Sequence, residues 1–122
     1  MLKIYLDDIR TPPDSSWLVV RSVEDFKERI LSASVSISAL SFDHDLGDKV
    51  PDGYDAAKWF VEYAMDNEEI AQNLKIVIVH SDNPPGRENI AAYFESARAH
   101  SVFSDDLVVE RRPAMLNNPV SK

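Results

Sequence analysis

The sequence predicts an α/β fold with a five-stranded parallel sheet, and three observations support this prediction. Short apolar runs recur along the 122 residues, and amphipathic helical patterns separate most of them. The runs are continuously apolar rather than alternating, which is typical of parallel strands covered by helices. Polar or charged residues follow directly after most of the runs. Since ligands of such sheets bind beyond the carboxyl ends of the strands, the same pattern indicates where a functional site would lie.

The first half of the chain predicts three strands and one helix. KIYL is short, apolar and β-branched and stops at an acidic pair, which is typical of a buried strand. RTPPDSS cannot form a long helix, because adjacent prolines and the residue before them resist helical geometry. Ser22 is followed three residues later by Asp25, which has the form of a capping box. The expected elements are strands at 3–6, 17–21 and 39–42 and a helix at 23–32.

The second half predicts two helices and two strands. YDAAKWFVEYAMDN places apolar residues on one stripe, which predicts an amphipathic helix. KIVIV is the most hydrophobic and β-branched run in the chain, which predicts a central strand. The loop DNPPG then leads into another helix, and Arg112 with Pro113 closes the last strand. The expected elements are helices at 54–67 and 87–99 and strands at 75–79 and 107–111.

Composition limits the classes of function. The chain has 13 Lys and Arg against 21 Asp and Glu, a formal net charge of -8. This balance argues against binding along an extended nucleic-acid groove, because such affinity comes mainly from cations that displace counterions. A small anion or an RNA end could still bind where a few cations and a metal are focused. The chain lacks cysteine, a leader pattern and a long apolar segment, so we expect one cytoplasmic domain over 1–122 with no membrane association.

Chemically reactive side chains gather at the expected ends of four strands. Carboxylates hold hard divalent cations, imidazole moves protons near neutral pH, and guanidinium groups clamp phosphate oxygens. Each group also has an ordinary interpretation, the acids as turn residues and the histidine as a structural one. Three charged groups at one buried strand end are nevertheless costly unless a cation is present. The residues are Asp7 and Asp8, then Asp43, His44 and Asp45, then His80 and Ser81, and finally Arg112.

These strand-end residues resemble those of the receiver domains of two-component signalling. In that family, the acidic pair and the aspartate after the third strand hold magnesium, and that aspartate accepts a phosphoryl group. The motifs LDDIR, DHDLG and VHSDNPPGRE resemble more narrowly a receiver-derived group named for a proposed role in processing cyclic phosphates. The resemblance spans nearly the whole chain. It implies a receiver-like, flavodoxin-like three-layer sandwich. The prolines after the first strand and the short, broken tail AMLNNPVSK depart from the family and predict that the first helix is shortened and the last absent.

The resemblance also assigns roles to individual positions. Asp7 and Asp8 match the acidic pair, and Asp43 matches the acceptor, although counting back from the Asp52–Gly53 pair would match Asp45 instead. Such an acid set implies Mg²⁺ or Mn²⁺ as the cofactor.

Three positions depart from the receiver pattern. His80 stands where receivers place serine or threonine, and Arg112 stands where they place lysine. Val109 occupies the position at which many receivers carry the aromatic residue of their switch. Histidine can move a proton near neutral pH, and arginine offers a planar fork for two phosphate oxygens. These changes remove the residues of the signalling switch and supply groups that suit hydrolysis of a phosphate ester.

The resulting hypothesis is a metal-dependent phosphoesterase that acts on a small or RNA-terminal phosphate ester, with a cyclic phosphate as one candidate. Attack on phosphorus would come from water or from the strand-end aspartate. The alternative is a phospho-accepting or non-catalytic regulatory module. The predicted site residues are Asp43, His80, His44 and Arg112 for catalysis, Ser81, Asn83, Arg87 and Arg10 for phosphate, and Asp7, Asp8, Asp43 and Asp45 for the metal.

Several of these positions have a second interpretation. Asn83 and Arg87 accompany a glycine-bearing loop that opens a helix, which suits an anion but equally suits a turn with an N-terminal cap. Arg10 either reaches the crevice or balances the acidic pair.

His100 is expected at the surface. Trp59, Phe60 and Tyr63 lie at helical spacing and are expected in the core.

The prolines after the first strand and the short tail leave one face of the predicted sheet thinly covered. An apolar face of that kind favours a partner or a second copy. The sequence therefore predicts a homodimer, with Trp17, Met115 and Leu116 helping to cover the face.

Overall fold

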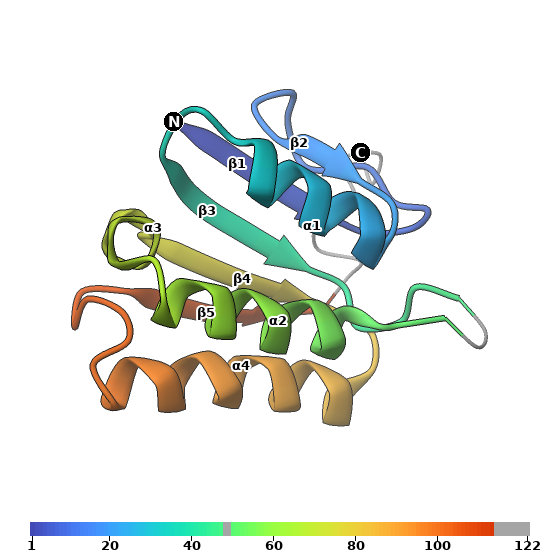
Figure 1. Cartoon of the computed structure of the whole chain (residues 1–122). Helices are drawn as coiled ribbons and strands as arrows, with labels where there is room; N and C mark the ends of the chain where they lie inside the picture. The colour runs from blue at the N-terminus through green and yellow to red at the C-terminus, as the bar shows by residue number, and fades with distance from the viewer. Residues whose placement is uncertain (48–49, 114–122) are drawn as a thin grey trace.

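A computed structural model describes residues 1–47 and 50–113. Its five strands form one parallel sheet in the order β2-β1-β3-β4-β5 (Figure 1). This confirms the predicted α/β fold, and each strand lies within two residues of its expected ends. The strands are β1 (Leu2–Leu6), β2 (Leu18–Val20), β3 (Ile37–Phe42), β4 (Ile76–His80) and β5 (Val108–Arg112).

Three longer helices cover one face of the sheet, side by side (Figure 1). The Ser22 side chain accepts a hydrogen bond from the Asp25 N–H at 3.1 Å and starts the first helix as expected. The last helix begins three residues earlier than expected, because prolines fit a first helical turn and Asn83 caps it. A short additional helix was not expected. The helices are α1 (Val23–Ser32), α2 (Gly53–Met65), α3 (Glu68–Asn73) and α4 (Pro84–Ala99).

The main core lies between these helices and the sheet. Phe42 of β3 packs against Phe94 of α4 with ring centroids 5.5 Å apart, and Phe60 of α2 joins them. Trp59 and Tyr63 stack on one another at the margin of this core and are only partly buried. The prediction of a core role is therefore met fully by Phe60 and in part by the other two.

The opposite face of the sheet carries a second set of buried side chains. Because side chains alternate along a strand, Tyr5, Ser41, Ile78 and His80 point away from the helices, and all four are buried. Trp17 lies edge-on to Tyr5 with centroids 6.1 Å apart. Within the described residues, no helix joins β1 to β2, so the first receiver helix is missing rather than short.

Two expectations fall on residues outside the described ranges. Met115 and Leu116, and the expected absence of a last helix, belong to 114–122. Among the helices of residues 1–47 and 50–113, none has both the length and the apolar character to span a bilayer.

Candidate functional site

Four strand ends meet at one edge of the sheet, as the sequence predicts. In the register of the sheet, Leu6 lies beside Phe42 and Phe42 beside Val79, so the residues that follow β1, β3 and β4 come together. The Asp43 N–H donates to the Leu6 carbonyl at 2.9 Å and holds the end of β3 against β1. His80 lies beside Arg112 on β5. The candidate catalytic residues thus come from one sheet edge.

Three carboxylates form the centre of this site. One oxygen each from Asp7, Asp8 and Asp43 lies within 4.8 Å of the others. Asp7 and Asp43 are buried and Asp8 is half-buried. Burial raises the pKa of Asp43 to about 7, and the negative charge of Asp7 adds to this rise. Oxygen ligands at this spacing fit Mg²⁺ or Mn²⁺, and a cation would relieve the cost of the buried charges.

Asp7 accepts the most side-chain hydrogen bonds of the three carboxylates. Its Oδ1 accepts the backbone N–H groups of Ile9 and Arg10 at 3.0 and 2.8 Å. Its Oδ2 accepts from Nε2 of His80 at 3.1 Å and from the Arg10 guanidinium at 3.5 Å. Burial by itself would raise the pKa of Asp7, but these donors outweigh it and lower the pKa. Since a carboxylate has about four acceptor positions, Asp8 and Asp43 have more capacity left for a cation.

His80 is enclosed within the protein. Its Nδ1 lies 2.6 Å from the Ser41 hydroxyl, its Nε2 faces Asp7, and its ring stacks on Tyr5 with centroids 4.3 Å apart. Burial lowers the pKa of His80, which favours a neutral ring. The ring has no exposed surface. The expected role as general acid or base therefore has no support in this geometry, and His80 acts on the site by holding Asp7.

Ser41 and Tyr5 were not predicted as part of the site. Ser41 lies two residues before Asp43, and Tyr5 lies two residues before Asp7. Each therefore shares the sheet face of the acid that follows it. The signal that could have identified them is a polar group within an apolar strand, two residues before the acid and so on the same face.

Arg10 reaches into the acid cluster. Its guanidinium lies 3.5 Å from both Asp7 and Asp43 and 3.1 Å from Asp82. Arg21 donates to the backbone carbonyls of Asp7 and Arg10 at 2.9 and 2.8 Å and fixes the loop after β1. Arg21 and Asp82 were also not predicted. A cleft of about 230 Å³ opens here, lined by Asp8, Ile9, Arg10, Asp43, Asp45, Gly47 and Asp82.

His44 lies beside the cluster and faces a different set of partners. Its Nδ1 is 2.9 Å from Asp45, its Nε2 is 3.5 Å from Asp52, and its ring packs on Gly86 at the start of α4. A Cβ atom on Gly86 would lie 2.4 Å from the Cγ atom of His44. Asp45 itself lines the cleft and is exposed. Asp43 directly follows β3 and belongs to the carboxylate cluster, so the geometry favours it over Asp45 as the acceptor position.

The remaining phosphate candidates hold the turn between β4 and α4. The Ser81 hydroxyl accepts the Asn83 N–H at 3.1 Å, and the Ser81 carbonyl accepts from Arg87 at 2.7 Å. The Asn83 side chain caps α4 by accepting the Gly86 N–H at 3.0 Å. These contacts support the alternative of a turn with an N-terminal cap. Arg112, at the end of β5, pairs with Glu110.

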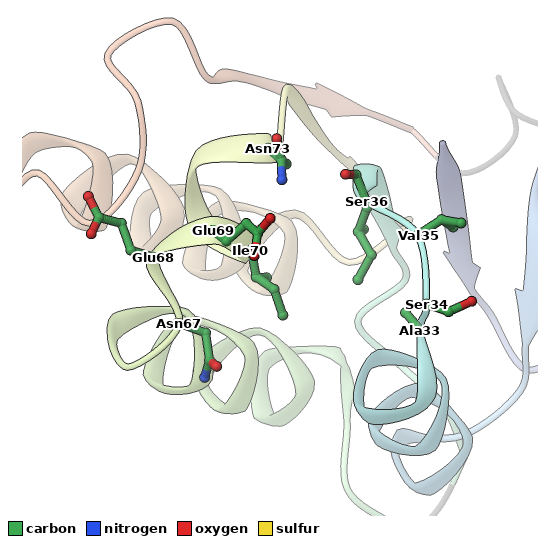
Figure 2. Close-up of a pocket in the computed structure, with 10 residues that line it drawn as sticks. Ala33, Ser34, Val35, Ser36, Asn67, Glu68, Glu69, Ile70 and Asn73 are labelled. Carbon is green, nitrogen blue, oxygen red and sulfur yellow. The ribbon is translucent and has the colours of Figure 1, made fainter.

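Another pocket lies at the opposite end of the sheet. It has a volume of about 420 Å³ and lies between the loop before β3 and helix α3 (Figure 2). Val35, Ile70 and several hydroxyl, amide and carboxylate groups line it, and none of the predicted site residues does. The predicted site residues therefore lie away from this pocket.

Comparison with known proteins agrees with the fold. Residues 2–96 match a family model described as the cyclic-phosphate processing receiver domain. No curated protein and no solved structure gives a significant match. The matched residues cover most of the chain, including β1 to β4 and the three clustered carboxylates. The chain therefore belongs to the cyclic-phosphate processing receiver domain family.

Proposed function

We propose that the protein is a divalent-metal-dependent phosphoesterase for a small or RNA-terminal phosphate ester, with a cyclic phosphate as the first class to test. The observation that carries this proposal is the cluster of Asp7, Asp8 and Asp43, within 4.8 Å, beside Arg10. Three acids with one neighbouring guanidinium have a surplus of negative charge that suits a divalent cation. The family to which the chain belongs supports the choice of a cyclic phosphate.

Asp8 and Asp43 would hold Mg²⁺ or Mn²⁺ directly, because the oxygens of Asp7 already accept several hydrogen bonds. Asp7 would add its negative charge from a fixed position. When bound, the cation would neutralise charge that develops on the phosphoryl oxygens. Asp45, exposed at the cleft, is the remaining metal candidate and would act only from the rim.

Two arginines would supply the phosphate contacts. Arg10 lines the cleft, and Arg112 ends the strand beside His80. Guanidinium groups match two oxygens of a phosphate at once, which a single point charge does not. The cleft of about 230 Å³ suits a terminal phosphate group better than an extended nucleic-acid chain.

Phosphorus NMR with a panel of cyclic and linear phosphate esters tests the proposal. We expect conversion of at least one ester with Mg²⁺ or Mn²⁺, and none with Asp8→Asn. Asp66→Asn at the end of α2 is the matched control and should retain the activity. Line broadening by the metal without any turnover would overturn the phosphoesterase.

The burial of His80 favours a second candidate, a phospho-accepting or phosphate-binding receiver module. The enclosed ring takes away one of the two histidines that were expected to act in hydrolysis. In this case Asp43 would accept a phosphoryl group and keep it. Labelling with acetyl phosphate distinguishes the two, since a stable adduct lost in Asp43→Asn identifies the module.

We also propose that the protein forms a homodimer through the sheet face opposite the helices. The centre of that face, with Tyr5 and Ile78, is already buried in the single chain. The contact would therefore rest on its margin, where Val108 is 47% exposed and Trp17 is partly exposed. A monomer in light scattering at micromolar concentration would overturn this proposal.

A further inference from the structure

The Arg10 side chain places its positive charge beside the two buried carboxylates of the site. One guanidinium nitrogen lies 3.5 Å from Oδ2 of Asp7 and 3.5 Å from Oδ2 of Asp43. Another nitrogen of the same group lies 3.1 Å from Oδ2 of Asp82 at the rim of the cleft. The guanidinium therefore joins the buried carboxylates to an exposed one.

The backbone of Arg10 is fixed, whereas its side chain is partly exposed. Its N–H donates to Asp7 at 2.8 Å, and its carbonyl accepts from Arg21 at 2.8 Å. The side chain is 29% exposed and lines the cleft. Any rearrangement of Arg10 would thus occur in the side chain and leave the loop in place.

We infer that Arg10 is a phosphate ligand that becomes available only when a divalent cation takes its place at Asp43. This inference rests on the proposed function, because it needs a cation at the same carboxylates. It goes further by coupling the two ligands: the cation binds first, and the phosphate binds to the arginine that the cation has displaced.

The charges explain the coupling. A divalent cation on Asp43 and a guanidinium 3.5 Å from the same oxygen repel each other in a partly buried site. Asp82 already contacts the other edge of the guanidinium, so it offers a second acceptor at which Arg10 keeps an ion pair. A guanidinium has five N–H donors, and those released from Asp43 and Asp7 would be available for phosphate oxygens.

A simpler alternative gives Arg10 the role of a fixed counter-charge that only stabilises the acids. Both hypotheses predict tighter cation binding when the arginine is removed. They differ in two ways. The fixed counter-charge predicts no loss of cation-dependent phosphate binding, and it predicts that Asp82 affects the cation equally with or without Arg10.

Titration with Mn²⁺, followed by electron paramagnetic resonance and calorimetry, tests the inference. We expect Arg10→Gln to bind Mn²⁺ at least about fivefold more tightly than the wild type, because a competing charge is gone. We expect the wild type to bind inorganic phosphate at least about tenfold more tightly with Mn²⁺ than without it, and Arg10→Gln to lose this gain. Arg29→Gln, on the exposed side of α1, is the matched control and should behave as the wild type.

A double-mutant cycle removes the remaining ambiguity. Asp82→Asn should weaken Mn²⁺ binding in the wild type, where Arg10 needs Asp82 as its second partner, and have much less effect in the Arg10→Gln background. An equal effect in both backgrounds, or phosphate binding that Arg10→Gln retains, would overturn the inference and leave the proposed function intact. If neither the wild type nor Arg10→Gln binds Mn²⁺, the metal-dependent function itself is wrong, and the inference falls with it.

Discussion

The Nε2 atom of His80 lies 3.1 Å from Oδ2 of Asp7, and neither side chain has any exposed surface. With a neutral ring, Nε2–H donates to the ionised carboxylate and Nδ1 accepts from the Ser41 hydroxyl. Ser41, His80 and Asp7 thus form a linear chain of hydrogen bonds that ends in the acid cluster. A fully buried residue therefore helps to hold Asp7 in place.

His80→Phe is expected to lower the free energy of unfolding by about 3 kcal/mol, because it leaves a buried carboxylate short of a donor. The new ring can still stack on Tyr5, so the change isolates the hydrogen bonds from the ring contact. Urea unfolding measures the effect. His100→Phe is the matched control, since His100 is exposed at the end of α4, and should cost less than about 0.5 kcal/mol. Equal stability of the two variants would show that the His80–Asp7 contact contributes little.

The raised pKa of Asp43 predicts how stability changes with pH in the absence of divalent cations. The folded-state pKa is about 7 and the ordinary value is 3.8, so between these values the folded protein holds more protons than the unfolded chain. The contribution of this group is therefore fully present below about pH 4 and is lost as pH rises through 7. Asp43→Asn removes this titration, so the stability of the variant relative to the wild type should rise from pH 5 to pH 8, by on the order of a few kcal/mol.

Urea unfolding in the presence of a chelator, at pH 5 and at pH 8, checks this expectation. The lowered pKa values of Asp7 and His80 make the free energy of unfolding rise with pH, which is the opposite of the Asp43 contribution, but both residues are present in both proteins. The comparison therefore isolates Asp43. A stability difference that does not change with pH would contradict the raised pKa.

Much of the fold could be predicted from short-range patterns. KIVIV indicates an interior strand, because a continuously apolar, β-branched run is stable only where both faces of a strand are covered. The Ser22 cap was predicted from two residues and is present. Helix α3 was not predicted, because six residues make a marginal helix whose stability comes from packing.

The acids of the site could be predicted because parallel strands bring their carboxyl ends together. The groups around them could not. Whether the His80 side chain is exposed or buried on the sheet face opposite the helices depends on the register of the strands. The same register brings Ser41 and Tyr5 into contact with it. Asp82 meets Arg10 across 72 positions of sequence, and no local pattern predicts such a pair.

Gly53→Ala is expected to destabilise the protein by about 2 kcal/mol or more, although a helical glycine replaced by alanine usually gains stability. A Cβ atom at this position would lie 1.8 Å from the Asp43 carbonyl oxygen, and backbone atoms there cannot rotate away. Gly86→Ala provides the comparison, because the three atoms nearest to its Cβ belong to the His44 side chain and not to backbone, and it should cost about 1 kcal/mol. Thermal unfolding measures both. A Gly53→Ala protein as stable as the wild type would show that the approach of α2 to Asp43 is not tight.

Asp8→Asn is expected to weaken Mn²⁺ binding by at least about tenfold, because it removes a charged ligand from the cluster within 4.8 Å. Asp45→Asn changes the same charge at the same cleft and should weaken binding by less than about threefold, since the Asp45 side chain is 66% exposed and its charge is screened by water. Calorimetric titration of both variants at one pH and ionic strength measures the contrast. A larger loss in Asp45→Asn would assign the metal to Asp45 and return the acceptor role to that residue. The expected order instead assigns the metal to the cluster that contains Asp8, at the carboxyl ends of β1 and β3.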